Sequence, residues 1–248
     1  MKNQIQIFHE HDSRYSGKVE GKFPEVERNL LQAAQSHLGR GSFAVSSGGL
    51  SRRDQLLAEV DALWLWFESG QHFLNPQWLG GLSAVSSGAE HEVFFDPSRQ
   101  LAIKVTRSGA FGHSVVGPGL SALPSEYFSR WIFHNQLFGD SVQLLGALKS
   151  EGGFQLVISQ VWIASDLECP TASELEIAGY FENLGFQKIA HLEVPAFYNE
   201  ELDLVILDAQ PHNVLKDDAG NLVPIDVVIG QPSPWTREWL GITPHTAR

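Results

Sequence analysis

The sequence predicts a mixed α+β fold in three regions, with a helical amino-terminal part followed by two β-containing parts. Residues 1–75 carry apolar residues at helical spacing, residues 76–165 contain paired strand patterns, and residues 166–248 contain short apolar runs after one helix. The chain has 248 residues, of which 43% are hydrophobic and 19% are charged. These values are typical of a globular protein that is long enough to build two cores.

The composition excludes several classes of protein. The net charge of -12 argues against nucleic acid as the main partner, because a duplex-binding surface needs many basic residues. The single cysteine, Cys169, cannot form an intrachain disulfide or a cysteine-based zinc site, which fits a reducing compartment. No stretch approaches the roughly 20 apolar residues of a membrane span, and residues 1–4 lack a signal-peptide core. We therefore expect a cytoplasmic protein without membrane contact.

Residues 1–75 are predicted to form a helical extension. Pro24 can open a first helix whose apolar positions continue to Leu38. A second helix is predicted from the S-x-x-D start at Ser51 to a stop at Gly70. Its apolar stripe consists of Leu56, Leu57, Val60, Leu63, Trp64 and Phe67. We expect this stripe to pack on the rest of the protein, and a partner-binding face is the alternative.

The middle region is predicted to be β-rich with one helix. The predicted strands cover residues 92–95, 101–106, 142–148 and 154–162. A helix is predicted from Pro124 to about Phe138. Between the second strand and this helix, residues 108–119 are too rich in glycine to form regular structure, and they lack the G-K-[ST] ending of a P-loop.

The last region is predicted to begin with a helix and to continue with short strands. A capping box at 171–174 starts the helix, which runs to about Leu184. The following apolar runs cover residues 204–207, 214–216 and 222–225. An aspartate, Asp208, follows the first run directly, Asn213 comes five residues later, and Asp226 ends the last run.

This pattern of oxygen-bearing side chains suits phosphoryl transfer, which depends on alignment and charge neutralisation. One carboxylate, Asp208, can orient an attacking hydroxyl group. The amide oxygen of Asn213 and the carboxylate of Asp226 can bind Mg²⁺, which prefers oxygen ligands. The hairpin between Asn213 and Asp226 is expected to return both residues to one site.

Residues upstream supply the complementary positive charge. Lys104 lies in the middle of a predicted strand, where it can reach phosphate oxygens, and Glu126 in the first helical turn can hold it. The alternatives for Glu126 are interaction with the helix dipole and a helical ion pair with Arg130. The small residues around Gly88 form a turn suited to close approach of phosphates.

Taken together, these motifs resemble the protein-kinase superfamily and, more narrowly, the kinase-like domains of polyvalent proteins from phages and other mobile elements. The resemblance is carried by Ser-Gly-Ala-Glu-His-Glu-Val-Phe at 87–94, Ala-Ile-Lys at 102–104, Asp-x-x-Pro-x-Asn at 208–213 and Pro-Ile-Asp at 224–226. It covers roughly residues 78–230. It implies a two-lobed kinase-like fold with the N-lobe at 76–165, a reduced C-lobe at 166–248 and an added helical region.

The resemblance also implies a role for each matching residue. Asp208 would be the catalytic base, with Lys104 and Glu126 as the other catalytic residues, and Asn213 and Asp226 would bind Mg²⁺. The nucleotide-binding positions implied for ATP are Ser87, Gly88, Ala89, Glu90, Lys104 and the hinge residues Gln160, Val161, Trp162 and Ile163. The segment 108–119 would then be compatible with a mobile flap near the terminal phosphate.

The sequence departs from ordinary protein kinases in ways that bear on the acceptor. Ile206 and Leu207 stand before Asp208 where most kinases have His-Arg. After Asp226, Val227 and Val228 replace Phe-Gly, and the given sequence continues for only a short stretch. A protein Ser/Thr/Tyr acceptor is favoured. A small-molecule phosphotransferase, a nucleotide-binding pseudokinase or interaction module, and an enzyme that transfers AMP are the alternatives.

Overall fold

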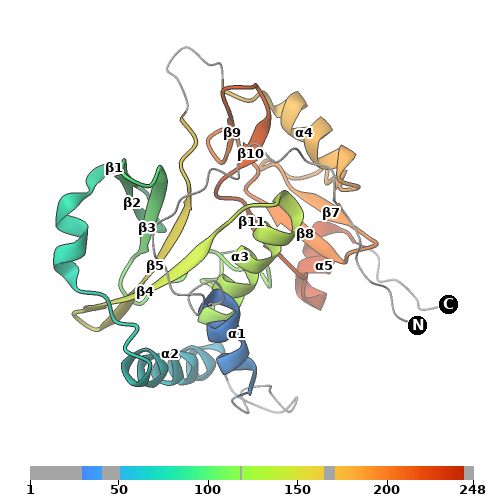
Figure 1. Ribbon diagram of the computed structural model, residues 1–248. Coiled ribbons are helices and arrows are strands. Elements are labelled where there is room, and N and C mark those ends of the chain that lie inside the picture. Colours follow the sequence, from blue (N-terminus) through green and yellow to red (C-terminus); the bar gives the residue numbers. More distant parts are fainter. Residues whose placement is uncertain (1–29, 41–50, 118, 165–170, 243–248) are drawn as a thin grey trace, which may run out of the picture.

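A five-stranded antiparallel sheet forms the upstream half of the computed structural model (Figure 1), which describes residues 30–40, 51–117, 119–164 and 171–242. Its order is β1-β2-β3-β5-β4. The strands are β1 (Ser83–Ser87), β2 (His91–Asp96), β3 (Leu101–Thr106), β4 (Gln143–Ser150) and β5 (Gly153–Val161). The central strand β3 is buried from Ala102 onward, and Lys104 pairs in register with Val93 and Ile158. A lysine at this position lies between two neighbouring strands.

Helix α3 (Pro124–Phe138) connects the sheet to the downstream half of the structure. Proline at its first position begins the helix, and Gly139 in the αL conformation ends it. Both bounds agree with the predicted range from Pro124 to about Phe138. The helix packs against β11 (Val228–Gly230), which belongs to the second sheet. The residue that precedes this strand by two positions is Asp226, so α3 runs beside the candidate site.

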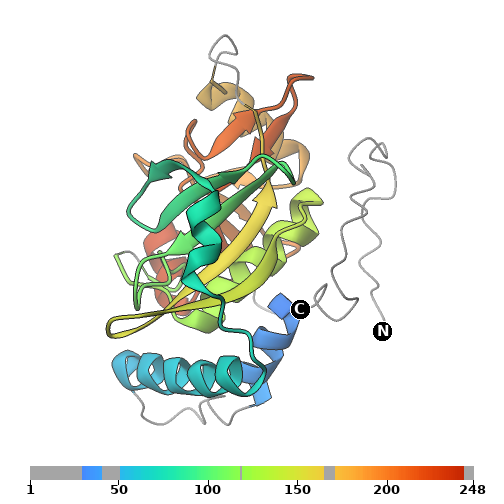
Figure 2. The same ribbon diagram turned by 60° about the vertical axis from the view of Figure 1, so that its left-hand side comes forward.

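Two helices of the predicted extension pack on α3 and the sheet: α1 (Leu30–Arg40) and α2 (Arg52–Ser69). The buried side chains of Ala34, Leu63 and Phe67 share one hydrophobic cluster with α3, β4 and β5. Figure 2 shows α2 lying below the sheet. The packing prediction for the stripe on the second helix is confirmed except at Leu57, which is 54% exposed. A short 3₁₀ helix, η3 (Pro76–Gly81), leads into β1.

The downstream half contains a second antiparallel sheet with the order β11-β8-β7-β6. Its other strands are β6 (Gln187–Lys188), β7 (Phe197–Asn199) and β8 (Leu204–Leu207). A separate hairpin joins β9 (Val214–Lys216) to β10 (Leu222–Pro224), and the helices are α4 (Glu174–Asn183) and α5 (Pro234–Leu240). The sequence predicted α4, β8, β9 and β10 but missed the two- and three-residue strands β6, β7 and β11.

The glycine-rich segment between β3 and α3 is irregular, as predicted, but it is held firmly by α5. Ser233 Oγ donates to the carbonyl of Val116, and Thr236 Oγ1 donates to the carbonyl of Val115, each at 2.7 Å. The indole ring of Trp235 lies where a Cβ atom on Gly117 would stand. These contacts argue against a freely moving flap in this state.

The predicted start of the first helix at Pro24 falls outside the described residues. In the described part of the chain, no helix combines the length and the apolar character needed to cross a bilayer. The mixed α+β architecture with antiparallel sheets is confirmed. The division into two lobes and an extension stays a prediction.

Candidate nucleotide and metal site

A continuous series of hydrogen bonds links Lys104 to the loop that carries Asp208. Lys104 Nζ donates to the carbonyl oxygen of Ile225 at 2.6 Å. The N–H of Ile225 donates to the carbonyl oxygen of Asn213 at 2.8 Å, and Asn213 Nδ2 donates to Asp208 Oδ2 at 2.8 Å. The series therefore connects three residues that the sequence singled out, Lys104, Asn213 and Asp208.

The loop that carries Asp208 is fixed in an unusual backbone conformation. Asp208 has a φ of 57°, in the left-handed region that few residues other than glycine adopt. Its carboxylate accepts hydrogen bonds from Gln210 Nε2 and Asn213 Nδ2, and its carbonyl oxygen accepts a second bond from Asn213 Nδ2. Strain of this kind persists only where the surrounding contacts over-determine it, and it is frequent in functional loops.

The carboxylate of Asp226 lies between two buried cations. Its Oδ1 atom is 2.8 Å from Arg130 Nη2 and 3.6 Å from Lys104 Nζ. Burial alone would raise the pKa of Asp226, but the charges of Lys104 and Arg130 hold this pKa well below its usual range. Asp226 is therefore ionised at neutral pH, and its side chain keeps 31% of its exposure, so a cation can approach it.

Lys104 is the buried cation of β3, with 4% exposure. Its ammonium group lies 4.9 Å from the centre of the Trp131 ring. Burial lowers the pKa of Lys104, and the charge of Asp226 opposes this effect. Lys104 is thus a buried cation whose ion-pair partner, Asp226, comes from the downstream half of the structure.

The structure corrects the expected partner of Lys104. The carboxylate of Glu126 forms a hydrogen-bonded ion pair with Arg52 of α2, at 2.6 Å and 3.0 Å, and it also accepts from the N–H of Leu123. Glu126 thus caps α3 and anchors α2, and it forms no ion pair with Lys104. The alternative ion pair with Arg130 is not formed either, because Arg130 points to the site.

Arg130 is the residue on α3 that contacts the site, and the sequence reasoning missed this role. Besides Asp226, its guanidinium binds Glu90 Oε1 at 2.6 Å and the carbonyl oxygens of Asp226 and Val227 at 2.9 Å and 3.0 Å. It is only 3% exposed. The signal that could have revealed it is an arginine within an otherwise apolar stretch of the helix.

The predicted phosphate loop lies at the turn from β1 to β2. Ser87, Gly88 and Ala89 are exposed, and Arg107 Nη2 holds Ser87 Oγ at 2.6 Å and the carbonyl of Gly88 at 2.9 Å. Glu90 turns inward to Arg130 instead of facing solvent. The loop is therefore connected to Asp226 through Glu90 and Arg130.

Of the predicted hinge residues, Gln160 and Val161 end β5, and Trp162 and Ile163 follow it. Val161 pairs with Leu101, the N–H of Trp162 donates to the carbonyl of Gln100, and the Trp162 ring packs on Phe95 with 4.7 Å between centroids. Gln160 is buried and donates to Asp140, and Ile163 is half-buried. These residues lie where the chain leaves the five-stranded sheet, which agrees with a connection between halves.

The oxygen atoms available as metal ligands fit a hard divalent cation. Asp226 offers an ionised carboxylate, and Asn213 spends its Nδ2 group on Asp208, which leaves its amide oxygen for a cation. Glu90, His91 and Asp226 also offer ligand atoms within 4.8 Å of one another. In that second group Arg130 already binds both carboxylates, Glu90 through Oε1 and Asp226 through Oδ1.

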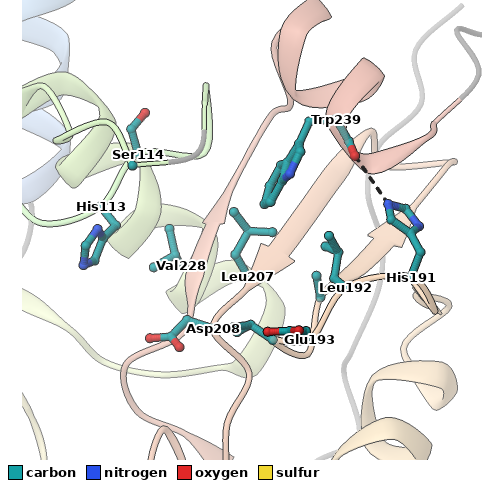
Figure 3. A pocket seen from close by; sticks show the side chains of 12 residues that line it. His113, Ser114, His191, Leu192, Glu193, Leu207, Asp208, Val228 and Trp239 are labelled. Carbon is teal, nitrogen blue, oxygen red and sulfur yellow. Dashed lines mark hydrogen bonds between the residues drawn. The ribbon is translucent and has the colours of Figure 1, made fainter.

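A pocket of about 530 Å³ lies beside Asp208, which is one of its lining residues (Figure 3). The lining also includes Leu207 and Val228, Leu192 and Glu193 from the β6–β7 loop, and Trp239 from α5. No sequence pattern predicted this pocket, because its walls come from segments far apart in the chain.

Comparison with protein-family models assigns the chain to the kinases. The matching model describes a Serine/Threonine/Tyrosine Kinase found in polyvalent proteins, and it covers residues 58–231. Because this match spans well over half of the sequence, the chain belongs to that family. The match confirms the resemblance and begins earlier than expected, inside α2. A search of curated proteins found no match.

Proposed function

We propose that this protein is a Mg-ATP-dependent phosphotransferase whose favoured acceptor is a protein hydroxyl group. The observation that carries the proposal is the hydrogen-bonded series from Lys104 through Ile225 and Asn213 to Asp208, with Asp226 beside it. A phosphate-binding cation, two metal-binding oxygens and a base are the groups that phosphoryl transfer needs. Family membership supports the kinase type of chemistry.

Each residue has a distinct role in the proposal. Lys104 neutralises the α- and β-phosphates, and the exposed turn at 87–89 covers them through backbone N–H groups. Asn213 and Asp226 hold Mg²⁺, which supplies charge neutralisation at the transferred phosphate. Asp208 accepts the proton of the attacking hydroxyl group. The residues 160–163 meet the adenine base.

The same proposal assigns residues 76–165 to an N-lobe and 166–248 to a reduced C-lobe, with the helical region added in front. The packing of α3 against β11 supports a site between these parts. The single cysteine supports a reducing compartment such as the cytoplasm.

The test is transfer of label from γ-labelled ATP to protein, compared among Asp208→Asn, Asp226→Asn and Asp218→Asn. Asp218 lies exposed in the β9–β10 turn and serves as the matched control. We expect Asp208→Asn to bind Mg-ATP but lose about 10²-fold or more in rate, since a general base contributes on this scale. We expect Asp226→Asn to lose Mg²⁺-dependent ATP binding as well, and Asp218→Asn to behave as wild type.

Other outcomes separate the alternatives. Label transferred from α-labelled ATP would show AMP transfer. Turnover that requires a small added alcohol would show a small-molecule phosphotransferase. Binding of Mg-ATP without any turnover would show a pseudokinase. No stabilisation by Mg-ATP at all would refute nucleotide binding, because a ligand that binds only the folded state must raise the melting temperature.

A further inference from the structure

The pocket beside Asp208 has mainly apolar walls that remain open to solvent. Two of its wall residues, Val194 and Trp239, are 47% and 36% exposed although both are large and hydrophobic. Figure 3 shows Leu207 and Trp239 facing each other, with Asp208 at one edge of the same pocket. An open apolar surface that ends at a carboxylate is suited to a ligand with an apolar body and one polar end.

The walls are held in place by contacts between lining residues and by contacts behind them. The ring of His191 lies 3.3 Å from the carbonyl oxygen of Trp239, which ties the β6–β7 loop to α5. Arg237 of α5 binds the carboxylate of Asp203, and Thr236 binds the segment that carries Ser114. The pocket is therefore preformed, and a ligand gains apolar contact without first ordering a loop.

The size and polarity of the pocket discriminate among hydroxyl groups. A serine or threonine side chain carries its hydroxyl group on one carbon and cannot cover Leu192, Leu207 and Trp239. A phenol ring places its hydroxyl group about 6 Å from the Cα-bearing end and covers such walls with apolar carbon. A volume of about 530 Å³ accommodates a ring together with neighbouring groups of a peptide.

The charge of the rim sets a second condition. Glu193 and Asp208 are the acidic residues of the lining, and the described lining contains no lysine or arginine. An acceptor that carries a carboxylate or phosphate next to its hydroxyl group would be repelled there. The pocket therefore suits an acceptor in which the groups around the aromatic ring are neutral or basic.

We propose that this pocket is the acceptor site and that it takes an aryl hydroxyl group, as in tyrosine, in preference to an aliphatic one. This inference rests on the proposed function. In the step, the phenol oxygen forms a bond to the γ-phosphorus of ATP, the bond from that phosphorus to the β–γ bridging oxygen breaks, and ADP leaves with the electron pair. The phenol proton passes to the Asp208 carboxylate and then to water.

The experiment uses the full chain with Mg-ATP and three degenerate peptide libraries that differ only in a central Tyr, Ser or Thr. We expect kcat/KM for the Tyr library to exceed the other two by at least 100-fold. A free aryl alcohol, p-cresol, and a free aliphatic alcohol, 1-butanol, form the second arm. If p-cresol is phosphorylated and the Tyr library is not, the acceptor is a small aryl alcohol. The preference for an aryl hydroxyl group over an aliphatic one then still holds.

Pocket variants test the location. Trp239→Ala and Leu192→Ala should raise KM for the Tyr library at least tenfold and leave KM for ATP within twofold. Leu175→Ala is the matched control, because Leu175 is an 84% exposed leucine on α4 outside the pocket lining. Glu193→Lys should increase phosphorylation of Tyr peptides with flanking acids.

Three results would overturn the inference. Equal or faster phosphorylation of the Ser or Thr library, or of 1-butanol, would refute the aryl preference while leaving the phosphotransferase function intact. Unchanged KM for the Tyr library in both pocket variants would refute the location. Failure to transfer γ-label to any acceptor, despite binding of Mg-ATP, would refute the proposed function together with this inference.

Discussion

Arg130 on α3 and Asp226 before β11 form a partly buried ion pair in which Nη2 of the arginine donates to Oδ1 of the aspartate at 2.8 Å. The same nitrogen donates to the carbonyl oxygen of Asp226 at 2.9 Å. This arginine also holds Glu90, so one guanidinium joins helix α3, the phosphate loop and the candidate metal ligand. The helix is therefore coupled to the site through Asp226, and not through an ion pair between Glu126 and Lys104.

The first prediction concerns the stability that Arg130 provides. Arg130→Met removes the partner of two carboxylates in a buried setting, so we expect a loss of about 3–5 kcal/mol in the free energy of unfolding. Urea denaturation measures this loss. Arg107→Met is the control, since the Arg107–Glu92 pair is more than one third exposed on both sides and should cost about 1 kcal/mol or less. Equal losses in both variants would contradict the assigned importance of Arg130.

The second prediction separates Glu126 from Lys104. Glu126→Gln should lower stability, because it weakens the pair with Arg52, but it should leave the Kd of Mg-ATP within about twofold. Lys104→Met should raise that Kd by about tenfold or more, which corresponds to about 1.4 kcal/mol. Isothermal titration calorimetry measures the Kd of Mg-ATP in both variants. A tenfold weaker Kd in Glu126→Gln would restore the partnership that the sequence first suggested.

The third prediction concerns pH and the buried His91. Burial lowers the pKa of His91 from 6.5 to about 4, with the neighbouring carboxylates of Glu90 and Asp226 opposing it and the cations Lys104 and Arg130 adding to it. In the unfolded chain this histidine takes up a proton near pH 6.5, so the unfolded state binds more protons between pH 6.5 and 4. Its contribution to stability is therefore lost as the pH falls through this window, by up to about 1.4 kcal/mol per pH unit.

Urea denaturation of His91→Gln at pH 7, 5.5 and 4.5 checks this effect. The variant should lose less stability on acidification than the wild type does. His113→Gln, at an exposed position, should keep the wild-type pH dependence. If the unfolding free energy of His91→Gln falls with pH as steeply as that of the wild type, groups other than His91 determine the pH dependence in this range.

The fourth prediction uses two glycines with similar backbone angles. Gly112 and Gly119 have φ values of 77° and 74°. A Cβ atom on Gly112 would lie 2.2 Å from the carboxylate carbon of Glu90, whereas a Cβ atom on Gly119 would meet no atom within 4 Å. Both alanine variants should lose about 1 kcal/mol from backbone strain. Gly112→Ala should lose more and should also weaken Mg-ATP binding, because it displaces Glu90 from Arg130.

Thermal unfolding and ATP titration of the two glycine variants give the comparison. Identical behaviour of Gly112→Ala and Gly119→Ala would mean that Glu90 adapts without cost. A selective loss in Gly112→Ala would show that the segment between β3 and α3 supports the site through Glu90.

The sequence predicts correctly the strands and turns whose placement is decided locally. Asp208 and Asn213 are five residues apart on one loop, and the β9–β10 hairpin brings Ile225 back to Asn213 through a short connection. The strand pattern around Lys104 likewise fixes its place in β3. Short-range turn and strand signals are sufficient for such contacts.

The contacts that the sequence could not predict are decided by tertiary packing. Glu126 and Arg130 lie four residues apart on one helix, so periodicity alone cannot say which of them faces Lys104 and which faces α2. The partner of Glu126 is Arg52, 74 residues earlier in the chain. The acceptor pocket is also invisible to local patterns, because Leu207, Leu192 and Trp239 come from three separate elements.

The cluster that α1 and α2 share with the sheet has a consequence for how the protein unfolds. Leu63 and Phe67 are fully buried against residues of α3, β4 and β5, and Arg52 and Glu59 bind the first turn of α3. Melting of α2 would expose this core and leave Glu126 without its cation. The helices α1 and α2 should therefore unfold together with α3 and the five-stranded sheet in a single cooperative transition, with no stable intermediate that has lost only α1 and α2.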